Sequence, residues 1–393
     1  MLKWIEFLHI YQPPNQESGV LDQVVIESYN HIVWLLTKYP NFKITLNISG
    51  SLLEQLDGNG YTELIKNLKF LIKQGKIELV SSAMYHPILP LLPESEVIRQ
   101  IKLNNEIITK RLGLKHQPAG FYLPEMAYSP RVAAIVKALG YQWIILDEIH
   151  FPKKHYNNQI KYQIKNNGLY VIFRNRAYSK SFPPESIVKN IKKLNPPIQK
   201  NNYLITAHDG ELYGHFHKND YGYYQKAFAH QAIKNILISD YLKTLKTTEQ
   251  ITPRSASWES TELELKKHIP FALWADPKNK IHQKFWALSE LAIKTVNQNQ
   301  SDPNYFWSRK HLDYGLSSCY FWWAAAKRPD SFSPVTWNPT AIEKGLKELT
   351  SSIRSLEHLN PRVKLKAEKL YLALIKIIWQ KHWKKYYQKN EKI

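Results

Sequence analysis

The chain has 393 residues, of which 44% are hydrophobic and 22% charged, a composition typical of a globular protein of one large domain or two ordinary ones. Its net charge of +21 is compatible with a polyanionic partner, but the lysines are dispersed and no nucleic-acid-binding motif accompanies them, so we expect a solvated basic surface and no specific nucleic-acid partner. The single cysteine, Cys319, excludes an internal disulfide framework and a cysteine zinc site.

The N-terminal segment MLKWIEFLHIYQPP does not resemble a secretory signal, because Glu6 and His9 interrupt its apolar residues. No later segment reaches the roughly 18 apolar residues of a membrane span. We therefore expect a soluble chain without a membrane span and, from the cysteine content, a cytoplasmic one.

Short apolar runs recur along the first half of the chain, with helical patterns between them. Predicted strands cover residues 4–10, 43–48, 76–81, 120–123, 142–147, 169–173 and 203–208, and the first long helix covers 20–40. The runs are continuous rather than alternating, which is typical of strands covered on both faces, as in a parallel sheet or barrel. The segment KLNPPIQKNN (193–202) predicts an exposed excursion or an ordinary loop before the last strand.

From about residue 220 the strand-like runs stop and amphipathic helical patterns begin. The clearest cover residues 282–296, 341–353 and 365–387. We therefore expect an α/β catalytic barrel over residues 1–270 and a helical region over 271–393 that packs on it.

Polar side chains lie in and just after several of the predicted strands, many of them near the strand ends. In a parallel barrel these positions converge on one mouth, which is where active sites are built. They are His9, Tyr11, Gln12, Asn47, Glu78, Glu125, Asp147, Glu148, Asp209 and Glu211.

Two of these carboxylates, Glu125 and Asp209, are candidates for a glycosidase pair. One carboxylate attacks the anomeric carbon and the other protonates the leaving oxygen; in retaining enzymes the two stand about 5 to 5.5 Å apart. The acid must hold its proton near neutral pH, which burial and a neighbouring carboxylate such as Glu211 favour. A lone carboxylate at a strand end is more often a helix cap or an ion-pair partner. The occurrence of several carboxylates at successive strand ends favours a catalytic pair.

Four motifs of this chain resemble those of glycoside hydrolase family 57: HIYQPP, GKIELVSSAMYHPILPLLP, GFYLPEMAYSP and HDGELYGH. The resemblance implies an incomplete (β/α)7 TIM-like barrel followed by a helical region, and a retaining mechanism on α-linked glucans or oligosaccharides without cofactor or metal. It implies Glu125 as nucleophile and Asp209 as general acid/base. The implied type, whether α-amylase, 4-α-glucanotransferase or α-galactosidase, is left open, as are hydrolysis versus transfer and the oligomeric state.

Two positions depart from the family pattern. Tyr11 stands where many members have a second histidine, and Cys319, in SSCYFWW, stands where well-studied members have an aspartate. Both put the familiar specificities in question while leaving the catalytic pair intact. The residues expected to contact the sugar are His9, Gln12, Glu78, His86, Glu211, His215, Trp258 and Trp274.

Three other interpretations stay open. A metal-dependent enzyme similar to polysaccharide deacetylases needs an aspartate and spaced histidines that HIYQ and its surroundings lack. A carbohydrate-binding protein that has lost turnover would keep the barrel with an altered fifth motif. A nucleic-acid or membrane-surface contact would use the basic C-terminal LYLALIKIIWQKHWKKYYQKN, which also fits a helix with a solvated lysine face.

Overall fold

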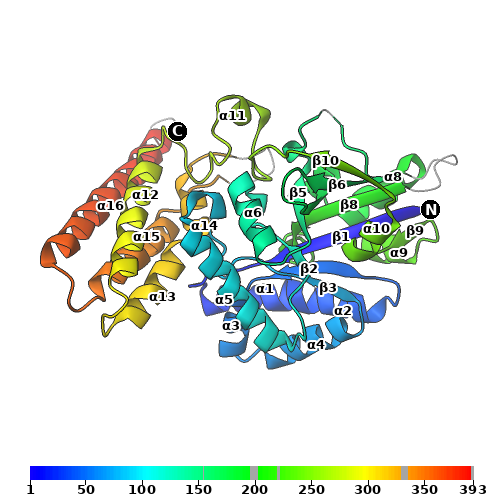
Figure 1. Cartoon of the computed structure of the whole chain (residues 1–393), viewed down its shortest axis with the longest axis horizontal. Coiled ribbons are helices and arrows are strands. Elements are labelled where there is room, and N and C mark those ends of the chain that lie inside the picture. Colours follow the sequence, from blue (N-terminus) through cyan, green and yellow to red (C-terminus); the bar gives the residue numbers. More distant parts are fainter. Residues whose placement is uncertain (154, 195–201, 219–221, 329–334, 391–393) are drawn as a thin grey trace. The chain divides into compact units, whose positions relative to one another are not determined.

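The computed structural model describes residues 1–153, 155–194, 202–218, 222–328 and 335–390 (Figure 1). Most of the loop predicted over residues 193–202 lies outside these ranges. The described chain forms two compact units: Met1–Met84 with Leu89–Trp258, and Tyr85–Ile88 with Glu259–Ile393. The division at Trp258 precedes the boundary expected after residue 270, because the segment that carries α11 (Glu262–Lys266) belongs to the second unit.

The first unit is built on parallel strands. Their bounds are β1 (Leu2–Ile10), β2 (Ile44–Ile48), β3 (Ile77–Val80), β4 (Gly120–Phe121), β5 (Trp143–Asp147), β7 (Tyr170–Arg174) and β8 (Asn202–Asp209). One sheet has the order β3-β2-β1-β8 and the other contains β7-β5-β4. A parallel bridge between Ser81 and Phe121 continues β3 into β4, and the Asn175 N–H donates to the Ile205 carbonyl at 2.7 Å beside β8. Each predicted strand is present, and the expected class, an incomplete (β/α)7 barrel followed by helices, is confirmed.

The continuous apolar runs are explained by burial on both faces. Phe7 of β1 lies 5.3 Å from the ring of Tyr122, whereas Leu8 and Ile10 pack in the core formed with the surrounding helices. These helices are α1 (Ser18–Val24), α2 (Asn30–Lys38), α3 (Gly50–Gly58), α4 (Thr62–Lys73) and α5 (Glu94–Leu112). The helix α6 (Pro130–Ala138) lies between β4 and β5 in the chain. Figure 1 shows α1 to α4 along one side of β1, β2 and β3.

The helix predicted over residues 20–40 is interrupted by a π-helical turn. It consists of α1 (Ser18–Val24), the π turn η1 (Val25–Tyr29) and α2 (Asn30–Lys38). A π turn inserts one extra residue and reorients its side chains, and such turns are frequent at functional sites. Here the hydroxyl of Ser28 donates to the Gly210 carbonyl at 3.0 Å. The π turn also lies close to Gly214, which has φ +93°. A Cβ at Gly214 would stand 1.9 Å from the carbonyl oxygen of Glu27, so only glycine fits there.

The expectation that strands stop near residue 220 is wrong. The strand β9 (Ile233–Asn235) pairs with the first residues of β1, and β10 (Thr247–Ile251) pairs with β6 (Ile160–Ile164). The sequence did not indicate β6 either. These strands are short or polar and largely lack the continuous apolar run that marks a doubly covered strand.

The second unit is helical. It contains α12 (Lys280–Gln298), α13 (Tyr305–Gly315), α14 (Ser318–Ala324), α15 (Pro339–Arg354) and α16 (Pro361–Asn390), so the three predicted helices are present and slightly longer than expected. Gly345 of α15 packs directly against the ring of Tyr320 on α14. The packing of these helices on the barrel stays a prediction. Among the described helices, none combines the length and apolarity needed to cross a membrane.

Candidate active site

Three polar residues form one row across neighbouring strands at the carboxyl end of the barrel. His9 of β1 pairs in register with Asn47 of β2 on one side and with Asp209 of β8 on the other. The Nδ1 of His9 lies 2.8 Å from Oδ1 of Asn47, and Nδ2 of Asn47 donates to the Val80 carbonyl at 2.9 Å. The parallel arrangement therefore brings these side chains to one mouth, as expected.

The His9 ring is neutral at ordinary pH. Burial lowers its pKa from 6.5 to about 4, and the hydrogen bond with Asn47 opposes this only partly. Because the Asn47 amide oxygen can only accept, Nδ1 carries the proton and Nε2 is the acceptor nitrogen. A neutral ring of this tautomer is suited to accept a hydrogen bond from a sugar hydroxyl.

Glu125 lies directly after β4 in a tight turn, Pro124–Met126. Its backbone has φ 59°, and Met126 follows with φ 48°, so two consecutive residues other than glycine adopt left-handed conformations. Such conformations cost about 1 to 3 kcal/mol each and are concentrated at functional sites. Oε2 of Glu125 accepts a 2.8 Å hydrogen bond from the Trp258 indole, and the Trp258 backbone N–H donates to the Glu125 carbonyl.

The buried phenol of Tyr122 lies near both carboxylates of the predicted pair. Its ring centroid is 4.6 Å from that of His9 and 6.0 Å from that of Trp258. Burial raises the Tyr122 pKa well above its ordinary value, and the charges of Glu125 and Asp209 raise it further. The charges of both carboxylates therefore act on the Tyr122 hydroxyl, one from the turn after β4 and one from the end of β8.

Asp209 and Glu211 differ in environment in a way that the sequence did not indicate. Asp209 is exposed, whereas Glu211 is only 6% exposed. Oε1 of Glu211 accepts hydrogen bonds from the Tyr29 hydroxyl at 2.5 Å and from Nε2 of Gln12 at 3.1 Å. Burial, and then the charge of Asp209, raise the Glu211 pKa from 4.5 to about 7. Glu211, the buried carboxyl of the two, therefore keeps its proton up to near neutral pH.

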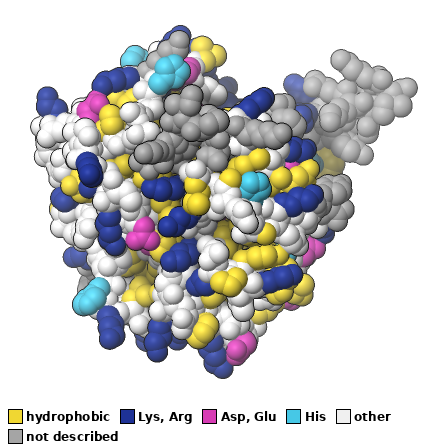
Figure 2. Space-filling model, turned by 90° about the vertical axis from the view of Figure 1, so that its right-hand side faces the viewer, with side chains coloured by type: hydrophobic (Ala, Val, Ile, Leu, Met, Phe, Trp, Pro, Cys, Tyr) yellow, Lys and Arg dark blue, Asp and Glu magenta, His cyan; other side chains and the backbone are white. Residues whose placement is uncertain are grey.

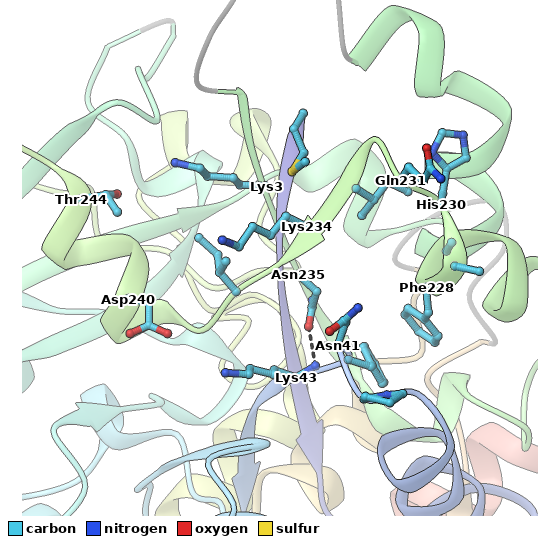
Figure 3. Close-up of a pocket in the computed structure, with 17 residues that line it drawn as sticks. Lys3, Asn41, Lys43, Phe228, His230, Gln231, Lys234, Asn235, Asp240 and Thr244 are labelled. Atoms are coloured by element: carbon cyan, nitrogen blue, oxygen red, sulfur yellow. Dashed lines mark hydrogen bonds between the residues drawn. The ribbon is translucent and has the colours of Figure 1, made fainter.

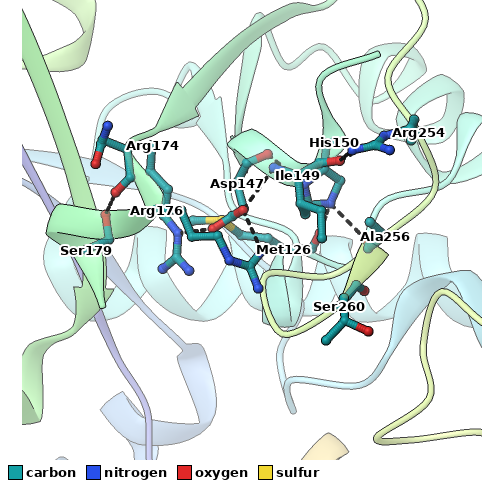
Figure 4. Close-up of polar contacts among 12 residues, drawn as sticks. Met126, Asp147, Ile149, His150, Arg174, Arg176, Ser179, Arg254, Ala256 and Ser260 are labelled. Carbon is teal, nitrogen blue, oxygen red and sulfur yellow. Dashed lines mark hydrogen bonds and ion pairs between the residues drawn. The ribbon is translucent and has the colours of Figure 1, made fainter. Parts of the chain in front are cut away.

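A buried ion pair supports this site from the neighbouring strands (Figure 4). Nε of Arg174 lies 2.7 Å from Asp147, which is fully buried, and Arg176 contacts the other carboxylate oxygen at 2.9 Å. Burial alone would raise the Asp147 pKa, but the two arginine charges hold it below its ordinary value. The Arg174 guanidinium also lies 4.8 Å from the Trp258 ring and donates to the Ala207 carbonyl at 2.6 Å.

His150 ties the Glu125 turn to the segment that carries Trp258. Its Nε2 lies 2.9 Å from the Met126 carbonyl and 3.0 Å from the Ala256 carbonyl, as Figure 4 shows for Ala256. Sequence reasoning did not assign roles to Tyr29, Tyr122, His150 or Arg174. Tyr122 lies inside GFYLPEMAYSP, one of the motifs that resemble the family, whereas Tyr29 lies inside a helical pattern that gives no signal of its function.

Two predicted sugar-binding residues, Glu78 and His215, form hydrogen bonds with neighbouring segments, and their contact with substrate stays a prediction. Glu78 pairs in register with Thr45, two residues below Asn47, and accepts from the Thr45 hydroxyl at 3.2 Å and from the Ser239 N–H at 3.1 Å. His215 bonds Glu27 at 2.5 Å, and Lys218 shares that carboxylate.

His86 and Trp274 belong to the second unit. There, Nδ1 of His86 lies 2.9 Å from the Ser318 hydroxyl, and Trp274 is fully buried. Their contact with substrate stays a prediction. Within the described ranges, no three His, Cys, Asp or Glu side chains gather as metal ligands would.

Comparison with known sequences gives a family match. The family model described as glycosyl hydrolase family 57 matches residues 20–255. The chain is 31% identical over 144 residues to alpha-amylase 1 of Dictyoglomus thermophilum, covering 37% of this chain and 21% of that protein. It is 30% identical over 151 residues to 4-alpha-glucanotransferase of Thermococcus kodakarensis, covering 38% of this chain and 22% of that protein. The matches therefore span less than a quarter of the length of these relatives.

Solved structures share the fold. The crystal structure of 4-alpha-glucanotransferase from Thermococcus litoralis superposes with a TM-score of 0.70 at 17% identity, over 91% of this chain and 60% of that one. The GH57 branching enzyme of Thermococcus kodakaraensis superposes with a TM-score of 0.68 at 13% identity, over 94% of both chains. The family model spans more than half of the chain, including the motifs around Glu125 and Asp209, so this chain belongs to glycosyl hydrolase family 57.

Proposed function

We propose that this protein is a retaining glycoside hydrolase or glycosyltransferring enzyme that acts on α-linked glucans or oligosaccharides. The observation that supports the proposal is that the charges of Glu125 and Asp209 both act on the buried Tyr122 hydroxyl, with Trp258 hydrogen-bonded to Glu125. The relatives named alpha-amylase and 4-alpha-glucanotransferase support the substrate class.

In the first step, Glu125 attacks the anomeric carbon while the bond from that carbon to the leaving oxygen breaks. Asp209, exposed at the mouth, gives its proton to the leaving oxygen. In the second step, Asp209 takes a proton from water or from a sugar hydroxyl. The resulting oxygen nucleophile attacks the anomeric carbon and releases Glu125 as a carboxylate.

The surrounding residues have distinct proposed tasks. Trp258 orients the Glu125 carboxylate through its indole N–H and offers part of its ring to the sugar. His9 and Gln12 bind hydroxyls. Where Glu211 is ionised, above about pH 7, its negative charge favours a proton on the neighbouring Asp209.

Azide rescue tests the two assigned roles separately. Glu125→Ala and Asp209→Ala are assayed on an aryl α-glycoside with a good leaving group, with and without sodium azide. If Glu125 is the nucleophile, azide enters from the face that it has vacated and gives the azide of inverted configuration. If Asp209 is the acid/base, the covalent intermediate still forms and azide gives the product of retained configuration.

Glu148→Gln is the matched control, because it removes a partly buried carboxyl at the neighbouring strand end and should leave turnover intact. Turnover of Glu125→Gln equal to that of the unmodified enzyme would exclude the nucleophile assignment. Sugar binding without turnover in the unmodified protein would instead favour a carbohydrate-binding protein on this barrel.

Incubation with maltooligosaccharides distinguishes hydrolysis from transfer, since shorter products alone indicate hydrolysis and a ladder with longer products indicates transfer. The cytoplasmic location expected from the lone Cys319 stays part of this proposal.

A further inference from the structure

A cavity lies at the opposite end of the barrel from the strand-end row. It has a volume of about 750 Å³ and is bordered by the first residues of β1, the start of β2, the strand β9 and α10 (Ile238–Thr244). Lys3 and His9 are six residues apart on β1, so at about 3.3 Å per residue the cavity is about 20 Å from the mouth. Figure 2 views the molecule from this end, where Lys and Arg side chains outnumber Asp and Glu.

Three lysines from separate strand segments converge on this cavity. Lys3 of β1 and Lys234 of β9 are direct register partners on adjacent parallel strands, and Lys43 immediately precedes β2. Figure 3 shows their side chains extending the same way, toward Thr244 and Asp240. The Lys3 ammonium is held in place by the Tyr203 hydroxyl at 3.1 Å.

The positive charge here is not balanced by acidic side chains of the cavity. Like charges placed directly opposite on paired strands destabilise a sheet, so the pairing of Lys3 with Lys234 has an electrostatic cost. Among the described residues that line the cavity, Asp240 is the only acidic one, and it lies 3.6 Å from Lys243. Burial lowers the pKa of nearby Lys76, and the positive charge of Lys43 lowers it further.

The other side of the cavity has a different chemistry. Phe228 and Pro40 provide apolar surface, while Asn41, His230 and Gln231 provide polar side chains. The Asn235 side chain fixes this wall, because its Oδ1 accepts from the Lys43 N–H at 2.5 Å and its Nδ2 donates to the Trp4 carbonyl at 3.1 Å. A ligand that fills the cavity would carry anionic charge at one end and an uncharged ring at the other.

We propose that this cavity binds a phosphate-bearing small molecule, with the phosphate on Lys3, Lys43 and Lys234 and its sugar or base moiety against the Phe228 side. Ammonium groups bind phosphate as point charges, and three of them match a group with two or more negative charges. The volume exceeds what a lone phosphate fills, so the ligand is of sugar-phosphate or nucleotide size. The site is separate from the glycosidase mouth and does not depend on the function proposed there.

Isothermal titration calorimetry of the full chain tests this site, with inorganic pyrophosphate, glucose 1-phosphate and adenosine diphosphate as probes. Glucose and adenosine are the uncharged counterparts, and ionic strength is kept constant with sodium chloride. The test variant is Lys3→Gln/Lys43→Gln/Lys234→Gln. The control variant, Lys69→Gln/Lys102→Gln/Lys137→Gln, removes the same charge from exposed lysines on α4, α5 and α6 of the same unit.

We expect pyrophosphate and at least one of the larger phosphates to bind the unmodified chain and the control variant. The cavity variant should bind them at least about tenfold more weakly, since hydrogen bonds to charged groups are lost. Tighter binding of glucose 1-phosphate identifies a sugar phosphate, and tighter binding of adenosine diphosphate identifies a nucleotide. Absence of binding by all three probes, or equal loss in the control variant, would overturn the proposal.

Thermal unfolding at low salt gives a second, independent readout. Because the cavity lysines repel one another, the cavity variant should unfold at a higher temperature than the unmodified chain when no phosphate is present. A lower unfolding temperature would show that the lysines stabilise the chain by themselves, and that result would also count against the site.

Discussion

The indole N–H of Trp258 donates a 2.8 Å hydrogen bond to Oε2 of Glu125, and the Trp258 backbone N–H donates to the Glu125 carbonyl at 3.1 Å. The two residues are 133 positions apart in the chain. These two hydrogen bonds tie the strained turn that carries Glu125 to Trp258. One carboxylate oxygen of Glu125 is bonded to the tryptophan. The other oxygen, Oε1, is the atom that we assign to nucleophilic attack.

Trp258→Phe keeps an aromatic ring and removes the N–H donor. A hydrogen bond to a charged group contributes about 1.5 to 3 kcal/mol, so we expect kcat to fall by about ten- to a hundredfold with a smaller change in KM. Steady-state kinetics on a maltooligosaccharide measure both. Trp34→Phe, an exposed tryptophan of the same unit, is the control and should leave both constants unchanged. A change in KM alone would mean that Trp258 contacts substrate without orienting Glu125.

Glu211→Gln should change the pH dependence of stability. Because the Glu211 pKa is raised from 4.5 to about 7, the folded protein keeps a proton in this range that the unfolded chain releases. The contribution of Glu211 to the free energy of unfolding is therefore fully present below pH 4.5 and declines by about 3 kcal/mol as the pH rises through 7. Urea unfolding of both proteins at several pH values measures the difference, with Glu106→Gln, on exposed α5 surface, as the control. A difference independent of pH would contradict the assignment.

His9 should remain neutral down to about pH 4, where its pKa lies. An unfolded histidine binds its proton near pH 6.5, so the stability that neutral His9 contributes is complete above 6.5 and is lost as the pH falls toward 4. Asn47→Asp places a carboxylate beside Nδ1 and should raise the His9 pKa. NMR titration of the imidazole resonances measures both proteins, and protonation of His9 near pH 6.5 in the unmodified protein would refute the expectation.

Arg174→Gln should destabilise the barrel strongly. The Arg174 side chain is 3% exposed and Asp147 is 0% exposed, and removal of one partner of a buried pair costs about 3 to 5 kcal/mol. Arg176→Gln removes the other, 23% exposed partner of the same carboxylate, and we expect a cost of about 1 kcal/mol or less. The free energies of unfolding in urea compare the two. Equal costs would show that Asp147 depends on both arginines alike.

Much of the barrel was predictable because its signal is local. A strand buried on both faces reads as a continuous apolar run, and β1 is such a run almost throughout. The strands β6, β9 and β10 lack that run, since they lie at sheet edges or pair over a few residues, and the sequence failed to indicate them. The break of the first helix into a π turn was equally hidden, because an apolar repeat of three to four residues does not reveal one inserted residue.

In the candidate site, too, the sequence predicted some features and not others. The positions of His9, Glu125 and Asp209 at strand ends follow from the chain order, since the residue after a strand must lie at the barrel mouth. The environment of each side chain does not. Glu78 lies inside the same kind of apolar run, and its register with Thr45 places it deeper in the barrel than Asn47.

The sequence by itself determined which residues end the strands and which motifs surround the carboxylates, because both depend on neighbours along the chain. Only the tertiary structure decided that Glu211 rather than Asp209 is the buried carboxyl, that Tyr29 reaches it from a π turn, and that Trp258 and Arg174 support Glu125. The physical reason is that burial, charge and hydrogen bonding act through space, between segments that the folded barrel brings together.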